Sequence, residues 1–327
     1  MHSMMSFVRR PKFESPDCGT AAYHIVVPSA ETSLEIATSF GGGRTRADAV
    51  TALFIGPLTI SALMTRVVRA DSSTADVAAT GCAPLVVTLT ASMINEWSAL
   101  FADTLFDRSK LLRQPIVMSA STLLLAQRLR LRLAGRRQPA SSPFLCIHAD
   151  DDETTPLLNE LFSDFLAVDP ASLFRRSSSR RTLVDRAREV LAGCPGSSHR
   201  LTDLAEGLGV SVFHFARLFR AETTLSVHQY LLRLRMARAL QRLSCSEVDL
   251  SRLALEIGFS SHSHFSATFH KQFGASPAQV RNLFKRSAFS AWPASGDTAR
   301  CDKRRDHRAA ASRPTRSPHV RRRRGAE

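Results

Sequence analysis

Residues 201–209 read Leu-Thr-Asp-Leu-Ala-Glu-Gly-Leu-Gly, and residues 250–258 read Leu-Ser-Arg-Leu-Ala-Leu-Glu-Ile-Gly. The same pattern therefore recurs at an offset of 49 residues. In each copy a hydroxyl residue, Thr202 or Ser251, precedes the Leu-Ala pair, and we expect it to be the N-cap of a helix. Each copy ends in a glycine, which readily takes the positive φ of a helix C-terminus. The pattern predicts two short helices that each end in a tight turn.

A second helix is expected after each turn, over residues 211–220 in the first unit and residues 260–273 in the second. Phe215 and Phe219 of the first unit have counterparts 50 residues later in the second. A helix, a short glycine-containing turn and a second helix with one apolar side is the helix-turn-helix pattern, whose second helix enters the DNA major groove. Two such units in register favour a DNA-binding domain over an ordinary helical bundle.

Residues 226–243 lie between the two units and contain no helix breaker. Their apolar side chains gather on two sides of the expected helix: Val227, Tyr230, Leu231 and Leu234 on one, and Leu232, Met236, Ala239 and Leu243 on the other. A helix of this length spans about 25 Å. With the flanking loops, the separation of the two reading helices would then be close to the repeat of successive major grooves on one face of DNA, about 34–36 Å. A third side would contact phosphates or be a solvated basic face, and it carries Arg235, Arg238 and Arg242.

Residues 183 to 285 resemble the DNA-binding domain of AraC/XylS-type transcription regulators. The resemblance rests on three stretches: Leu-Ala…Gly-Val-Ser…Phe-Ala-Arg-Leu-Phe-Arg in the first unit, the connector Tyr230-Leu-Leu-Arg-Leu-Arg-Met-Ala-Arg-Ala-Leu, and Ile-Gly-Phe-Ser-Ser-His-Ser-His-Phe-Ser…Phe…Phe-Gly-Ala-Ser-Pro at 257–277. It implies a seven-helix domain whose two recognition helices enter adjacent major grooves. Such domains are usually fused to a regulatory domain that senses a small molecule or mediates dimerisation.

The outward sides of the two second helices carry the candidate DNA contacts. They are Ser211, Val212, Phe213, His214, Arg217 and Arg220 in the first unit, and Ser261, His262, Ser263, Ser266, Ala267 and Lys271 in the second. Arg217 is expected to read guanine, because a guanidinium can donate to O6 and N7 together, and the resemblance places it at the family's base-reading arginine. Phe213 would pack on a thymine methyl or lie in the core, and His214 would meet phosphate. Because Ala267 stands where the first unit has Arg217, the second helix is expected to add mainly backbone and shape contacts.

The charge of the chain supports a polyanionic partner. Its formal net charge is +15 over 327 residues, of which residues 1–180 carry +1, residues 181–286 carry +7 and residues 287–327 carry +7. We therefore expect double-stranded DNA as the partner of the C-terminal part. The basic tail at 287–327 is expected to be disordered, and its arginines would add salt-sensitive attraction to DNA or have no role.

The predicted fold class is α+β, with a mixed β/α regulatory or sensing domain at 1–175, a linker at 176–182 and an all-α DNA-binding domain at 183–286. Strand-like and helical patterns in the first part lie at 23–27, 34–40, 85–90 and 155–166. The uncharged run at 49–65 is expected to be a buried strand or core helix rather than a membrane span.

No cofactor, metal or catalytic site is expected. The six cysteines lie far apart, which favours a reducing cytoplasm, and the first 25 residues lack a signal-peptide pattern. His262 and His264 would point about 200° apart on a helix, and Asp150–Glu153 lacks the spacing of a calcium loop.

The expected function is sequence-specific, non-catalytic transcription regulation in the cytoplasm. Beyond DNA, the candidate partners are RNA polymerase, a small-molecule effector and a second copy of the chain, with no membrane partner. The alternative is a DNA-repair or amidotransferase-like protein with a reactive cysteine in the N-terminal half. Cys82 is the candidate nucleophile of the amidotransferase-like alternative.

Overall fold

A computed structural model gives the fold of the chain. It describes residues 23–30, 32–38, 44–55, 60–67, 83–89, 115–134, 144–149, 152–166, 178–245 and 248–287.

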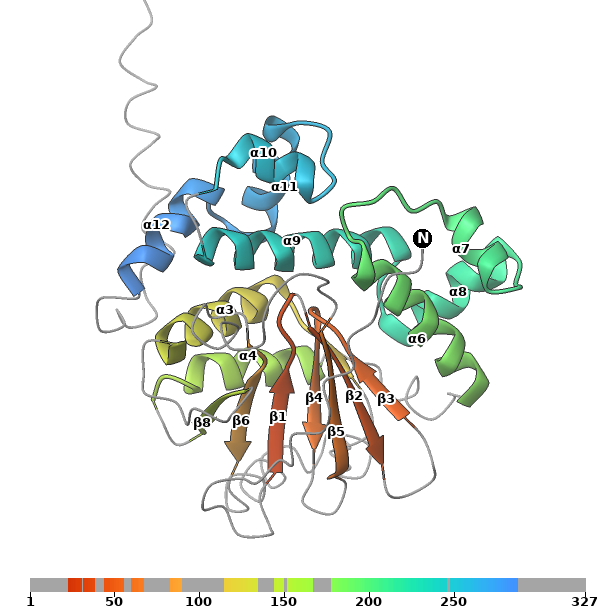
Figure 1. Cartoon of the computed structure of the whole chain (residues 1–327), viewed down its shortest axis with the longest axis horizontal. Coiled ribbons are helices and arrows are strands. Elements are labelled where there is room, and N and C mark those ends of the chain that lie inside the picture. Colours follow the sequence, from red (N-terminus) through yellow and green to blue (C-terminus); the bar gives the residue numbers. More distant parts are fainter. Residues whose placement is uncertain are drawn as a thin grey trace, which may run out of the picture. The chain divides into compact units, whose positions relative to one another are not determined.

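Eight strands in the described N-terminal part form two sheets (Figure 1). The five-stranded sheet has the order β7 (Ile116–Val117), β4 (Thr51–Ile55), β1 (Tyr23–Val27), β6 (Leu85–Leu89) and β8 (Leu145–His148). Its neighbouring strands are antiparallel except for the parallel pair β6 and β8. The three-stranded sheet is antiparallel, in the order β3 (Arg44–Ala47), β2 (Thr32–Thr38) and β5 (Ile60–Val67).

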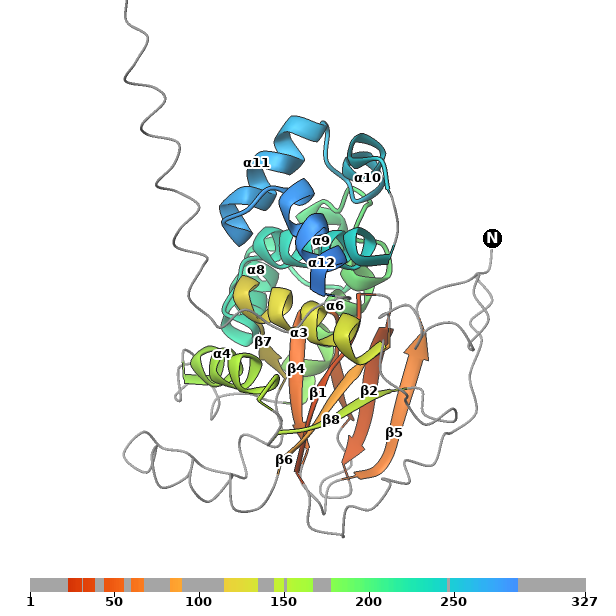
Figure 2. The same ribbon diagram turned by 90° about the vertical axis from the view of Figure 1, so that its left-hand side faces the viewer.

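The central strands of the five-stranded sheet are buried on both faces. Ile25 and Val27 of β1 belong to a large apolar cluster, whereas Val26, which points to the opposite face, belongs to a second and smaller one. The large cluster also contains apolar side chains of α3 (Ala120–Ala134) and α4 (Thr155–Leu166). Helix α3 packs against β8, α4 and α9, so it lies between the strands and the C-terminal helices (Figure 2).

The sequence predictions for this part are confirmed in outline. Strand β1 has the predicted bounds, β2 begins two residues before the predicted run, and α4 begins at Thr155 as expected. The run at 49–65 contributes to β4 and β5, so the strand interpretation was correct. Among the described residues, none of the helices is both long and apolar enough to span a bilayer.

Seven helices occupy the described residues from 178 onward, which agrees with the number that the family resemblance implies. They are α6 (Ser178–Gly193), α7 (Leu201–Gly207), α8 (Val212–Thr223), α9 (Val227–Cys245), α10 (Leu250–Glu256), α11 (His262–Phe273) and α12 (Pro277–Ser287). Figure 1 shows α9 connecting the pair α7 and α8 with the pair α10 and α11. The mixed α+β class is confirmed.

Helix α6 begins at Ser178, inside the segment that we expected to be a linker. Its polar first turn is followed by Val184, Ala187 and Leu191, which are buried. The buried stripe stabilises the helix, which then extends back into the serine- and arginine-rich segment because nothing there breaks it. Residues 176–177, like the tail from 288 onward, lie outside the described residues.

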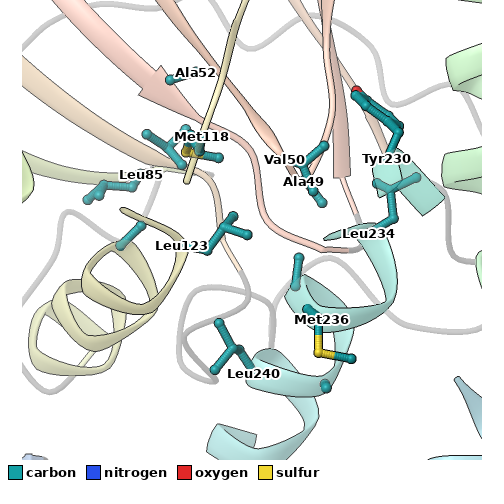
Figure 3. Packing of buried hydrophobic residues seen from close by; sticks show 14 of the residues in the cluster. Ala49, Val50, Ala52, Leu85, Met118, Leu123, Tyr230, Leu234, Met236 and Leu240 are labelled. Carbon is teal, nitrogen blue, oxygen red and sulfur yellow. The ribbon is translucent and has the colours of Figure 1, made fainter. Parts of the chain in front are cut away.

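One apolar cluster contains side chains from the strands, from α3 and from α9. Figure 3 shows Leu85, Met118 and Leu123 together with Leu234, Met236 and Leu240 of α9. The buried side chains of α9 confirm that this helix has more than one apolar side, as its sequence predicts.

Candidate nucleic-acid interface

The two repeated turns have the same backbone geometry. Gly209 and Gly258 have φ values of 71° and 89°, in the left-handed region that glycine tolerates best. Beyond each glycine, the next N–H donates back to the helix: Val210 to the carbonyl of Ala205 at 3.0 Å, and Phe259 to that of Ala254 at 2.8 Å. These are Schellman turns, so the glycine prediction is confirmed in both units.

The predicted N-caps of the first helices are wrong. Helix α7 begins at Leu201 with Arg200 as N-cap, and no side chain caps it. Helix α10 has Asp249 as N-cap, whose carboxylate accepts the N–H groups of Ser251 and Arg252 at 3.1 and 3.4 Å. Each helix starts before the predicted hydroxyl residue, and an aspartate two residues earlier than Ser251 was an equally good cap signal in the sequence.

The second helix of each unit starts at a serine N-cap. Ser211 accepts the N–H of His214 at 3.3 Å, and Ser261 accepts the N–H of His264 at 3.2 Å. Both serines were predicted DNA contacts. Since a hydroxyl that accepts a backbone bond still has its own proton to donate, each cap can also donate to a phosphate.

The inner sides of α8 and α11 are equivalent. Phe215, Phe219, Phe265 and Phe269 are fully buried, and within each helix the two rings meet edge to face with centroids 5.8 and 5.6 Å apart. The buried phenylalanines fix which side of each helix remains available.

The structure places the predicted contact residues on the outward sides of α8 and α11. Phe213 is 80% exposed, so the alternative that it lies in the core is wrong. Ser266 is half-buried, and its hydroxyl lies 3.3 Å from Nε2 of His262. The other predicted residues are exposed: Ser211, Val212, His214, Arg217 and Arg220 on the first side, and Ser261, His262, Ser263, Ala267 and Lys271 on the second.

Two arginines of α9 bind groups of the protein itself. Arg235 donates to three backbone carbonyls, those of Pro195, Ser197 and Gly258. Arg242 forms an ion pair with Glu256 of α10 at 3.2 Å. Both guanidinium groups therefore have partners within the protein, and a phosphate contact from this side of α9 stays a prediction.

Sequence reasoning missed a buried polar cluster formed by Asp48, Arg188 and Tyr230. The Tyr230 hydroxyl donates to Oδ2 of Asp48 at 2.6 Å, and Nε of Arg188 lies 3.1 Å from the same oxygen. Burial raises the pKa of Tyr230 well above 10.0, with the Arg188 charge opposing the shift. The three side chains come from the turn before β4, from α6 and from α9, so they join strands to helices.

Within the residues that the structure describes, no group of three or more His, Cys, Asp or Glu side chains could hold a metal ion. The His264 ring packs against Phe259 with centroids 5.2 Å apart. Cys82, Asp150 and Asp151 lie outside the described residues.

The C-terminal region is similar in sequence to known helix-turn-helix proteins. Residues 204–283 match a family model described as a helix-turn-helix domain. The Msm operon regulatory protein of Streptococcus mutans serotype c is 32% identical over 130 residues, which cover 39% of this chain and 45% of that protein. The transcriptional activator RhaR of Salmonella dublin is 31% identical over 111 residues, which cover 34% of this chain and 39% of that protein. The chain thus spans less than half the length of these two relatives.

The crystal structure of a transcriptional regulator from Chromobacterium violaceum, described as containing an AraC-type DNA-binding domain, aligns with 33% of this chain and 96% of its own, with 27% identity and a TM-score of 0.31. The family model shows that residues 204–283 contain a helix-turn-helix domain, which agrees with what the resemblance implied for this part of the chain.

Proposed function

We propose that the protein is a sequence-specific DNA-binding transcription regulator that inserts α8 and α11 into successive major grooves. The observation that carries the proposal is the repetition itself. Two helix pairs have the same glycine turn, the same serine N-cap and the same buried aromatic side, and each leaves the outward side of its second helix exposed. Both named relatives are regulators, which supports a role in transcription.

In this proposal the two helices read DNA unequally. Arg217 donates to a guanine, and Phe213 packs its exposed ring on a thymine methyl. Helix α11 offers His262, Ser263 and Lys271 but has Ala267 where α8 has Arg217. The second helix therefore contributes phosphate and shape contacts more than base readout.

The rest of the chain regulates and supports this binding. Residues 1–175 act as a regulatory domain. The segment at 176–182, whose residues from Ser178 onward belong to α6, joins it to a DNA-binding domain at 183–286. The tail at 287–327 adds non-specific attraction. A small-molecule effector, RNA polymerase and a second copy of the chain are its candidate partners in the cytoplasm. The protein acts by binding and needs no catalytic step.

Selection of bound fragments from genomic DNA by the full-length protein at physiological salt tests the proposal. A common enriched motif is expected, because base contacts discriminate by about 1–3 kcal/mol each. If all fragments are retained equally, without a common motif and less strongly at higher salt, the protein binds only the DNA backbone through its basic charge. That result would overturn the proposal.

A further inference from the structure

Arg235 of α9 connects two segments that belong to different helix-turn-helix units. Its Nε donates to the carbonyl of Pro195 at 2.8 Å, and its Nη2 donates to that of Ser197 at 3.0 Å. Both carbonyls lie in the loop that leads into α7 of the first unit. Nη1 donates to the carbonyl of Gly258 at 2.9 Å, in the turn that leads into α11 of the second unit.

The same two segments are in backbone contact beside Arg235. A Cβ added at Gly258 would collide with the carbonyl oxygen of Gly196, and one added at Gly196 would collide with that of Glu256. Both positions therefore need glycine for this close approach. The loop before α7 and the turn before α11 form one tightly packed junction.

The junction is mechanically connected to the second reading helix. The Arg235 guanidinium lies 5.9 Å from the ring centroid of Phe259, within range of a cation–π contact. Phe259 in turn packs against Phe265 of α11, with ring centroids 5.5 Å apart, and against His264. A shift of the turn at Gly258 would therefore shift α11.

Arginine is suited to this role for a chemical reason. Its planar guanidinium holds its donors in a fixed fork, so three carbonyls bound to it are fixed relative to one another. A lysine at the same place has one flexible ammonium group and could not hold three separate acceptors in one rigid arrangement. Arg235 is half-buried, and each of its three guanidinium nitrogens donates to a backbone carbonyl of the protein.

From this geometry we propose that Arg235 is a positioning residue that fixes the distance between the two reading helices and so sets the spacing of the two half-sites that the protein accepts. The inference rests on the proposed function, because the spacing matters only if both helices enter DNA. Successive major grooves on one face of DNA repeat about every 34–36 Å, so a rigid junction penalises any other spacing.

The test uses the full chain and the motif that selection returns. Affinity is measured for duplexes with the selected spacing and for duplexes with one base pair inserted or removed between the half-sites. The wild type is expected to prefer the selected spacing by about ten-fold or more, within the usual range of coupling between sites. Arg235→Ala and Arg235→Lys should each reduce that preference at least about three-fold while the same half-sites are still recognised.

Two further variants make the result specific. Gly196→Ala keeps Arg235 but puts a methyl group against the Glu256 carbonyl, so it should relax spacing in the same way by a different route. Arg186→Ala removes an exposed arginine of α6 and serves as the control for lost charge, with wild-type spacing preference expected. Circular dichroism of each variant confirms that it is folded, and Gly196→Ala decides the matter if the Arg235 variants unfold.

The outcomes separate the two proposals. Folded Arg235 or Gly196 variants with the spacing preference of the wild type would overturn the positioning role and leave the proposed function intact. A wild type that binds its motif without any spacing preference would overturn both the positioning role and the insertion of two helices into successive grooves, and would leave sequence-specific binding by one helix. Failure of the wild type to select a motif would overturn the proposed function, and the positioning role with it.

Discussion

On the outward side of α8, Arg217 has the chemistry to read a base pair through two hydrogen bonds. It is exposed and lies one turn before Arg220, nearer to the N-terminal end of α8. In helix-turn-helix proteins the N-terminal residues of the recognition helix are the ones that contact base edges. Buried Phe215 and Phe219 hold the helix so that this side is free. Arg220, close to the helix C-terminus, is better placed for phosphate.

The two arginines should therefore differ on substitution. Arg217→Ala is expected to cost about 1–3 kcal/mol of discrimination at one base position, because the bidentate contact is lost. Arg220→Ala, the matched loss of one charge, should weaken binding evenly across sequences and reduce the salt slope by about one. Competition binding with single-base variants of the selected motif measures both effects. A larger loss of specificity for His262→Ala, or for any change in 260–271, would contradict this ranking.

The two helix-turn-helix units have the same turns and the same N-cap on their second helices, but their first helices have different N-caps. Both units have the glycine turn and the serine N-cap of the second helix. The first helices differ, because α10 begins at the carboxylate of Asp249 whereas α7 begins at Arg200 with no side-chain cap. Equal sequence patterns therefore do not imply equal stability of the two units.

This difference predicts the effect of two neighbouring substitutions. Asp249→Ala should lower the free energy of unfolding by about 0.5–2 kcal/mol, because two N–H groups of α10 lose their acceptor. Ser251→Ala, at the position that the sequence pattern favoured as the cap, should change it by no more than about 0.5 kcal/mol. Urea denaturation of the full chain compares them. Equal destabilisation by both variants would show that Asp249 is not the functional cap.

At the scale of the whole molecule, Asp48, Arg188 and Tyr230 join the strands to the C-terminal helices through a buried polar cluster. Arg188 also donates to Oγ1 of Thr51 at 3.1 Å and to Oδ1 of Asp185 at 2.9 Å. Burial raises the pKa of Asp185, an effect that the Arg188 charge opposes. A buried charge is strongly unfavourable without such partners, so the cluster depends on all its members.

Tyr230 gives this cluster a measurable signature at alkaline pH. Its pKa in the folded protein is raised above 10.0, so the stability that it contributes is fully present below pH 10 and is lost as pH rises through the folded-state pKa. The chain has two tyrosines, and the difference in tyrosinate absorbance between wild type and Tyr230→Phe isolates this one. We expect Tyr230 to ionise only when the helical signal is lost. Ionisation near pH 10 in a folded protein would contradict the buried cluster.

The sequence predicted those features that are local or repeated. The glycine turns, the buried phenylalanines and the single long connector follow from spacing along the chain, and the structure confirms them. The Asp48 cluster could not be predicted, because its partners are 140 and 182 residues away from Asp48. The contacts of Arg235 could not be predicted from the sequence for another reason. Their acceptors are backbone carbonyls, which every residue type has, so no side-chain pattern indicates them.

Footprinting of the full-length protein on its selected DNA tests the central claim that two reading helices enter successive major grooves. Hydroxyl-radical cleavage and methylation of guanine N7 report backbone and major-groove contacts separately. We expect two protected regions on one face of the duplex, with centres about 10–10.5 base pairs apart, and guanine protection mainly in the half-site that α8 reads. A single protected region, or two regions on opposite faces of the duplex, would contradict the account.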